Sequence, residues 1–197
     1  MPADRAPEAF AVVLFAGGRA RRLPHKLERI VGGVPLLLRT ARNVHDAGPL
    51  AIACSTPPPA IVAACRADLV LPDRSPYRGP LAALADAARQ LEYAWLAAVA
   101  ADLPFVDASV LRALASAREP GDEAVVAEHD GIVEPLCALY ERAAILREAP
   151  ALLANGALAM HELVRRLRVR SVAMPSDRFV NVNTEHDLLL AEEMVGA

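Results

Sequence analysis

Phe10-Ala11-Val12-Val13-Leu14-Phe15-Ala16, followed directly by Gly17-Gly18, is the stretch that decides the fold. Seven consecutive apolar residues ending at a glycine pair are typical of a strand that is buried on both faces and runs into a loop. Such strands belong to parallel sheets covered by helices, because only there are both faces hidden from water. The stretch therefore predicts an α/β protein.

The rest of the chain repeats an alternation of strands and helices. Further strands are predicted at residues 50–54, 68–71, 94–100, 123–127, 136–140, 169–173 and 179–182. Helices are predicted at residues 35–47, 60–65, 80–91, 107–117, 141–153, 160–167 and 184–194, the last with Thr184 as its N-cap and Asp187 at its third position. This pattern predicts a mostly parallel sheet with its ligand crevice at the carboxyl ends of the strands.

Length and composition narrow the class of protein. The 197 residues, 54% of them hydrophobic, fit one domain spanning 1–197. A formal net charge of -3 disfavours a nucleic-acid partner. The three scattered cysteines predict reduced core residues. The N-terminus is not a basic segment followed by an apolar run, and no apolar stretch is long enough to cross a bilayer. We therefore expect a soluble cytoplasmic protein with no membrane partner.

The glycine pair opens a loop that carries the cationic residues Arg19, Arg21, Arg22 and Lys26. Glycines let backbone N–H groups approach phosphate oxygens, and cationic side chains offset the charge that develops on a leaving pyrophosphate. The sequence contains neither GxxxxGK[ST] nor GxGxxG, which excludes a Walker loop and the dinucleotide fingerprint. The loop favours a polyphosphate ligand, although the same residues also fit a tight turn followed by a solvated basic loop.

Two further loops at the expected crevice carry candidate ligand contacts. Asp102 directly follows the predicted strand at 94–100, where one carboxylate can hold the Mg²⁺ of an NTP complex. The alternative is that Asp102 binds loop N–H groups ahead of the helix that starts near Asp107. Asp73 could bind a ribose or base and the Gly79 backbone a nucleotide, or this segment is a plain helix-initiating turn.

Five motifs in chain order resemble the molybdenum cofactor guanylyltransferase family and its nucleotidyltransferase relatives. They are the AGG strand end with its arginine-rich loop to Lys26, then GPLAAL, ADLPF, VEPLCALY and FVNVNTEHDL, spanning Phe15 to Leu188. The resemblance implies a Rossmann-like three-layer αβα sandwich of nucleotidyltransferase type, an NTP donor and Mg²⁺ as the cofactor. It implies catalytic roles for Arg22, Lys26 and Asp102, with Asp102 also holding the metal. It implies nucleotide or acceptor contacts for Phe15, Ala16, Gly17, Gly18, Lys26, Asp73, Gly79, Asp102, Asn181 and Asn183.

The implied reaction passes GMP from GTP to the terminal phosphate of molybdopterin or molybdenum-molybdopterin, and pyrophosphate leaves. No covalent enzyme intermediate is needed, since alignment and charge neutralisation by Mg²⁺, Lys26 and Arg22 carry the chemistry. The implied partners are GTP, the pterin acceptor and, transiently, proteins that deliver the cofactor or receive the product. Alternatives are cytidylyl transfer to the same cofactor, nucleotidyl transfer to another small phosphorylated acceptor, and a non-catalytic nucleotide-binding protein.

The sequence also departs from the family pattern. Leu23-Pro24-His25 is one residue shorter than the usual segment and has no acid before Lys26. Ala53-Cys54-Ser55-Thr56 lacks the common asparagine, and Asn155-Gly156-Ala157-Leu158 lacks a following basic residue. The basic run Arg165, Arg166, Arg168 and Arg170 is typical of a solvated helix end, with a partner or acceptor contact as the alternative.

Overall fold

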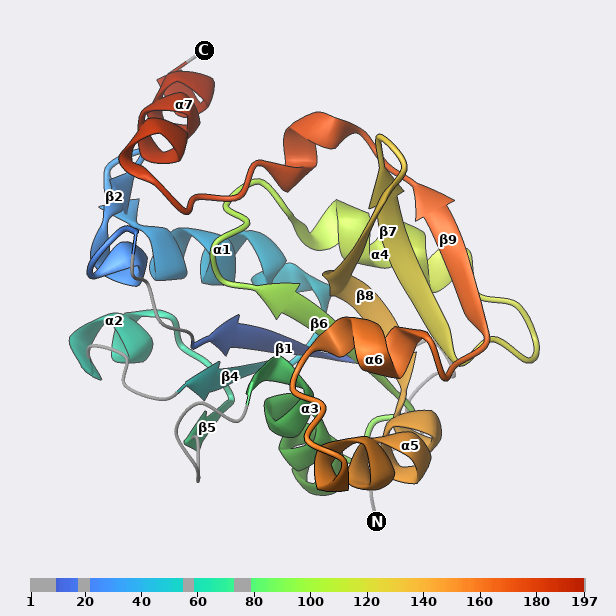
Figure 1. The fold of residues 1–197 in the computed structure, drawn as a ribbon. Helices are drawn as coiled ribbons and strands as arrows, with labels where there is room; N and C mark the ends of the chain where they lie inside the picture. Colours follow the sequence, from blue (N-terminus) through green and yellow to red (C-terminus); the bar gives the residue numbers. More distant parts are fainter. Residues whose placement is uncertain (1–9, 18–21, 55–58, 73–78, 197) are drawn as a thin grey trace.

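The first strand, β1 (Phe10–Ala16), lies in the interior of a seven-stranded sheet in the computed structural model, which describes residues 10–17, 22–54, 59–72 and 79–196 (Figure 1). All seven residues of β1 are buried. Its side chains alternate between two cores, with Val12 and Leu14 in one cluster and Val13 and Phe15 in the other. An apolar residue is therefore needed at every position of this strand, not at every second one.

The sheet has the strand order β5-β4-β1-β6-β8-β7-β9. The other strands are β4 (Leu50–Cys54), β5 (Leu69–Pro72), β6 (Trp95–Ala100), β7 (Ala124–His129), β8 (Ile132–Glu141) and β9 (Val169–Ala173). The pairs β1–β4, β1–β6, β4–β5 and β7–β9 are parallel, whereas β8 runs antiparallel to both of its neighbours. The predicted mostly parallel sheet is confirmed.

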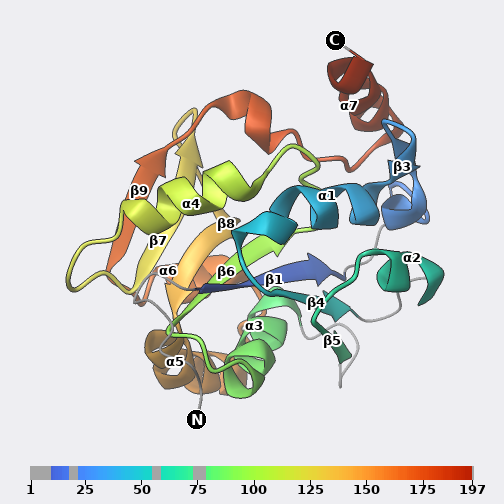
Figure 2. The ribbon, with the colours of Figure 1, turned by 180° about the vertical axis from the view of Figure 1, so that it is seen from behind.

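Helices cover both faces of the sheet, which gives the predicted three layers (Figures 1 and 2). On one face lie α1 (Leu36–Val44) and α4 (Ala108–Ser116), and the short α2 (Pro59–Ala64) packs into the same core. On the other face lie α3 (Gly79–Gln90), α5 (Arg142–Ala154) and α6 (Met160–Val164). No helix in the described ranges is long and apolar enough to cross a bilayer.

A third apolar cluster joins the end of the chain to the loop after β1. The last helix, α7 (Glu185–Gly196), packs there against a short hairpin of β2 (Ile30–Val31) and β3 (Val34–Pro35). Arg29 reinforces the contact by donating to both carboxylate oxygens of Glu185, each at 2.6 Å. This packing brings the last helix beside the hairpin that follows β1, on the left of Figure 1.

The sequence predictions for three segments need correction. The strand predicted at 179–182 is absent, because Ser176–Phe179 form a 3-10 helix (η3) and the Val182 N–H donates to the Asp102 carbonyl oxygen instead of to a strand. The strand predicted at 136–140 begins already at Ile132, because β8 forms a hairpin with β7 in which Asp130 and Gly131 turn the chain with positive φ. The helix predicted at 160–167 ends already at Val164.

Candidate active site

The central strands of the sheet create a crevice at their carboxyl ends. From β1 the chain builds β4 and β5 on one side, then crosses through α3 to β6 on the other side. Where the connections that follow neighbouring strands run to opposite sides of the sheet, a crevice opens at the carboxyl ends of those strands. Open α/β sheets bind their ligands in this crevice. Phe15 pairs with Ala100, so Gly17 and Asp102 follow their strands at the same edge. In Figure 1 the arrowheads of β1 and β6 both point to this edge.

Three side chains from distant parts of the sequence meet at this edge. Lys26, the only lysine in the sequence, lies in a 3-10 turn, η1 (Lys26–Glu28). Its Nζ donates to Asp102 Oδ2 at 2.5 Å and to Asn183 Oδ1 at 2.8 Å. The side chains of Lys26 and Asp102 are 15% and 19% exposed, so a ligand can still reach the pair. The sequence had placed all three residues among the candidates.

The backbone around Asp102 is fixed by hydrogen bonds to three neighbouring segments of the chain. The Ala101 N–H donates to the Phe15 carbonyl of β1 at 3.1 Å, and the Thr40 hydroxyl of α1 donates to the Ala101 carbonyl at 2.9 Å. The Val182 N–H donates to the carbonyl of Asp102 itself at 3.0 Å. Thr40 is fully buried, and sequence reasoning missed it because a lone threonine inside an apolar helix carries no spacing signal.

Asn183 is held in place by the start of α7. Asp187 Oδ2 accepts hydrogen bonds from the N–H groups of Asn183 (2.9 Å) and Thr184 (2.8 Å), and Thr184 Oγ1 accepts from the Asp187 N–H (3.2 Å). This is the capping arrangement predicted from Thr184 and Asp187. Burial alone would raise the pKa of Asp187, but these hydrogen bonds outweigh it and lower the pKa below its ordinary value. The neighbouring Asn181 is exposed.

The second carboxylate oxygen of Asp102 has an incomplete environment. Asp102 Oδ1 is buried and accepts no hydrogen bond from any described residue. A buried carboxylate oxygen without a partner is costly, so such a position favours a cation or ligand that completes it. The helix-capping role considered for Asp102 belongs instead to Asp107, whose Oδ1 accepts from the N–H groups of Ser109 and Val110 at the start of α4.

The structure describes most of the remaining predicted site residues. Phe15 and Ala16 are buried at the end of β1, while Gly17 and Arg22 are exposed. Gly79 starts α3 with a φ of +76°, and a Cβ there would lie 2.4 Å from the Leu158 carbonyl oxygen. The close approach of the Leu158 backbone therefore requires glycine at position 79, independently of any contact between Gly79 and a nucleotide. Gly18, Ser55 and Asp73 lie outside the described residues.

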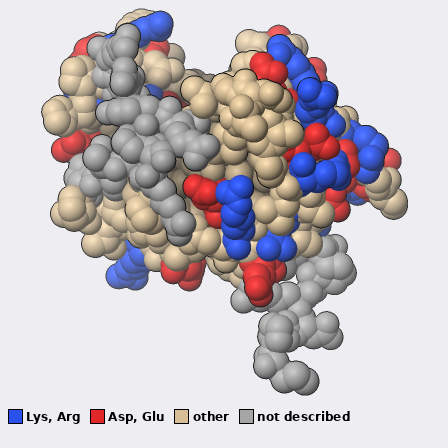
Figure 3. Space-filling view, turned by 60° about the horizontal axis from the view of Figure 1, so that its bottom comes forward, with Lys and Arg blue, Asp and Glu red and all other residues tan. Residues whose placement is uncertain are grey.

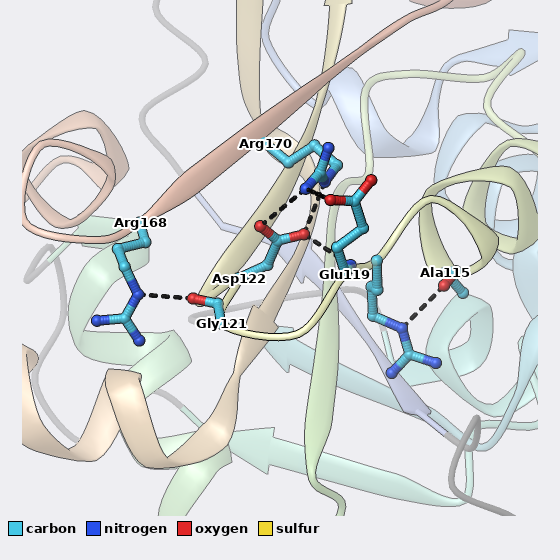
Figure 4. Close-up of polar contacts among 7 residues, drawn as sticks. Ala115, Glu119, Gly121, Asp122, Arg168 and Arg170 are labelled. Carbon is cyan, nitrogen blue, oxygen red and sulfur yellow. Dashed lines mark hydrogen bonds and ion pairs between the residues drawn. The ribbon is translucent and has the colours of Figure 1, made fainter.

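The basic run after α6 faces acidic neighbours at the opposite edge of the sheet. Arg170 pairs with Glu119 and Asp122, and Arg168 donates to the Gly121 carbonyl (Figure 4). The hydrogen bond from Arg170 is the main cause of the lowered pKa of Asp122. Figure 3 shows blue and red side chains intermingled on the right, where α6 and β9 lie. The run is thus a network of ion pairs at the amino ends of β7 and β9, away from Asp102.

A mostly parallel sheet with a lysine, a carboxylate and an amide at the carboxyl edge of its central strands defines an α/β protein of nucleotidyltransferase type. A family model described as MobA-like NTP transferase domain matches residues 12–172, and the chain belongs to this family. The enzyme class expected from the sequence, a nucleotidyltransferase, is confirmed by this match and by the named relatives.

Individual relatives agree with the family. A "Probable molybdenum cofactor guanylyltransferase" of Opitutus terrae is 32% identical over 192 residues, covering 91% of this chain and 93% of that protein. A protein of the same name from Bacillus licheniformis is 34% identical over 128 residues, covering 60% of this chain and 64% of that protein. The solved structure of molybdopterin-guanine dinucleotide biosynthesis protein A from Archaeoglobus fulgidus has a TM-score of 0.79 at 25% identity, covering 95% of this chain and 99% of that one.

Proposed function

We propose that this protein transfers GMP from GTP to the terminal phosphate of molybdopterin or molybdenum-molybdopterin and releases pyrophosphate. The names of the relatives support the choice of substrates. The observation that carries the proposal is the contact of Lys26 with Asp102 and Asn183, beside a buried Asp102 oxygen that has no donor among the described residues. Such a cation-carboxylate pair at the carboxyl edge of β1 and β6 suits a nucleoside triphosphate.

The reaction balances without a covalent enzyme intermediate. An oxygen of the acceptor's terminal phosphate attacks the α-phosphorus of GTP and forms the new P–O bond. The bond between the α-phosphorus and its bridging oxygen to the β-phosphate breaks, and its electron pair leaves with pyrophosphate. Both reactants are anions, so the protein has to align them and offset their charge. No general base is required, because the attacking phosphate oxygen is already ionised.

Lys26 has the central role in this scheme. Its ammonium group is held by Asp102 and Asn183, which places the positive charge at the mouth of the crevice. With GTP bound, Lys26 donates to phosphate oxygens and stabilises the charge that develops on the leaving pyrophosphate. Asn183 keeps the ammonium group aligned, since its own backbone is fixed by Asp187. Arg22, exposed on the same loop, adds positive charge from the solvent side.

The residues present also fit a divalent cation, and we propose Mg²⁺. Magnesium binds through one or two carboxylates together with phosphate oxygens and water, so a single aspartate with an available oxygen suffices. Asp102 is that residue, with Oδ1 buried and without a donor in the described structure. When bound, the ion would neutralise phosphate charge as a Lewis acid. Asp102 thereby serves both the ion and Lys26.

The choice of nucleotide is tested by offering GTP, CTP and ATP with Mg²⁺ and measuring pyrophosphate release with and without molybdopterin. We expect release that depends on molybdopterin and is fastest with GTP. Preference for CTP would assign the protein to cytidylyl transfer instead. Release with GTP and a different phosphorylated acceptor would change the acceptor, and binding of NTP without any release would leave a nucleotide-binding protein.

A further inference from the structure

Helix α1 carries two polar side chains on a side that is otherwise apolar. Six residues of α1 are buried, and Thr40 is the polar one among them, with no exposed surface. Asn43 follows three residues later and is partly buried, so the two side chains are neighbours on the helix surface. A hydroxyl in an apolar core is unfavourable unless it has a hydrogen-bond partner, so the contacts of Thr40 need an explanation.

Both side chains donate to carbonyl oxygens of the loop that follows β6. The Thr40 hydroxyl donates to the Ala101 carbonyl at 2.9 Å. The side-chain amide of Asn43 donates to the Pro104 carbonyl at 2.8 Å. Asp102 lies between these two carbonyls in the sequence. Helix α1 therefore holds the loop on each side of the carboxylate that belongs to the candidate active site.

The Thr40 hydroxyl also has a local acceptor, the Leu36 carbonyl at 3.2 Å. Threonine hydroxyls in helices often make this bond, but a hydroxyl has only one proton to donate. The Leu36 carbonyl already accepts the helical hydrogen bond of the Thr40 N–H. No other described residue donates to the Ala101 carbonyl, and Ala101 is only 1% exposed. Loss of the hydroxyl would therefore leave the Ala101 carbonyl, rather than that of Leu36, without a partner.

The same helix fixes the segment that carries Lys26. The Leu36 N–H at the start of α1 donates to the Arg29 carbonyl at 2.8 Å, and the Arg29 N–H donates to the Lys26 carbonyl at 3.1 Å. One end of α1 thus holds the turn η1, and its two polar side chains hold the loop of Asp102. The contact between the Lys26 ammonium group and the Asp102 carboxylate joins two segments that are attached to one rigid element.

We propose that Thr40 and Asn43 are positioning residues that hold Asp102 where its carboxylate binds the divalent cation of the GTP complex. This inference rests on the proposed function, which assigns GTP and the cation to the site. The peptide unit between Ala101 and Asp102 is planar, so fixing the Ala101 carbonyl also fixes the backbone from which the Asp102 side chain starts. Magnesium requires near-octahedral geometry with ligand distances of about 2.0–2.1 Å, so a small shift of this backbone weakens its binding.

The test measures how strongly Mg²⁺ and GTP support each other's binding. Isothermal titration calorimetry gives the dissociation constant of GTP with Mg²⁺ and with EDTA, without any acceptor. We expect Mg²⁺ to tighten GTP binding by about tenfold or more in the wild-type protein and by less than about threefold in Thr40→Val. Valine keeps the shape of the side chain but leaves the Ala101 carbonyl unpaired, so the loop shifts. Asn43→Leu lowers the ratio less, because water can reach this partly buried position. Thr40→Ser, which keeps the hydroxyl, and Arg42→Gln, at an exposed position of α1, keep the wild-type ratio.

A merely structural role of Thr40 would weaken GTP binding equally with Mg²⁺ and with EDTA, and that result would overturn the inference. An unchanged ratio in a folded Thr40→Val protein, or a Thr40→Ser ratio as low as that of Thr40→Val, would also overturn it. Thermal unfolding checks that each variant is folded. Pyrophosphate release from GTP and molybdopterin on the same samples separates the two proposals. Release with an unchanged Thr40→Val ratio keeps the transfer reaction and removes the positioning role. A ratio that depends on Thr40 without any release keeps the positioning role and removes the reaction.

Discussion

At the scale of a single residue, much of the proposed chemistry depends on the positive charge of Lys26. The sequence contains 20 arginines and this one lysine, and it is the lysine that lies against Asp102. A flexible ammonium group can move from Asp102 to a phosphate oxygen, whereas a planar guanidinium group would keep its two-pronged pairing with the carboxylate. This difference explains why a chain that uses arginine elsewhere has lysine here.

Replacing Lys26 by alanine should lower kcat/KM for GTP by about 100-fold or more, because charge on the leaving pyrophosphate is no longer offset. Steady-state kinetics with GTP and molybdopterin measures the effect. The matched control is Arg29→Ala, which removes a cation three residues away whose partner is Glu185. A Lys26→Ala protein that keeps turnover within threefold of wild type, and loses only affinity for GTP, would make the site a binding site rather than a catalytic one.

At the residue scale the sequence predicted which side chains to examine but not how they are supported. Lys26, Asp102 and Asn183 stood out because each lies in a motif, and the structure brings them together. Thr40 did not stand out as a site residue. Its position depends on how α1 packs against the loop after β6, which leaves no pattern in the sequence.

At the scale of elements, the start of α7 links stability to the site. We expect Asp187→Ala to lower the free energy of unfolding by about 1 kcal/mol at neutral pH, because two N–H groups lose their acceptor. The folded-state pKa of Asp187 is lowered, so its stabilisation is complete above the ordinary value of 3.8 and is lost as the pH falls through the lowered pKa. Urea unfolding of wild type and variant at several pH values measures the difference.

The difference in unfolding free energy between wild type and Asp187→Ala should stay constant from neutral pH to about pH 5 and shrink below pH 3.8. Glu193→Ala, an exposed acid on the same helix, is the control and should change stability little. A gap between wild type and Asp187→Ala that does not narrow in acid would refute the capping role. Turnover of Asp187→Ala should also fall, because the backbone of Asn183 is released.

The start of α3 offers a second test at this scale. Gly79→Ala places a Cβ 2.4 Å from the Leu158 carbonyl oxygen at a positive φ, so it combines a backbone clash with backbone strain. Gly121→Ala has a positive φ but open space around the Cβ, so it carries strain alone, about 1–2 kcal/mol. Denaturant unfolding should show a larger loss of unfolding free energy for Gly79→Ala than for Gly121→Ala. Equal losses of unfolding free energy would mean that the Leu158 backbone moves away from the added Cβ at little cost.

The order and type of most elements could be predicted, since strands buried on both faces and amphipathic helices leave clear patterns in this chain. The segment 179–182 was predicted wrongly because its apolar residues are buried without pairing to a strand: Phe179 packs from η3 into the core over the sheet, and Val182 packs against α7. The hairpin of β2 and β3 was missed because two-residue strands are too short for a periodic signal. Tertiary packing, not local preference, decides both.

At the scale of the whole molecule, the two cores share the same strands. β1 contributes side chains to both clusters, and so do β4 and β6. We therefore propose that residues 1–197 unfold as one domain. Denaturation followed by fluorescence of Trp95, the only tryptophan, and by far-ultraviolet circular dichroism should give coincident transitions. Two separate midpoints would indicate that one helix layer unfolds independently.

The architecture as a whole followed from the sequence except for the direction of β8. The alternation predicted a mostly parallel sheet, and the sheet is mostly parallel, but a hairpin with two turn residues reverses β8. Because Val99 lies opposite Cys137, that reversal carries the first residues of β8 beyond the end of β6.

The most direct test of the central claim follows the phosphorus atoms of GTP. The protein is incubated with Mg²⁺ and molybdopterin, once with GTP labelled at the α-phosphate and once with GTP labelled at the γ-phosphate. We expect the α label to appear in the pterin product and the γ label in pyrophosphate, and Lys26→Ala to slow the appearance of both by about 100-fold or more. An α label that stays with free nucleotide while molybdopterin remains unmodified would contradict it.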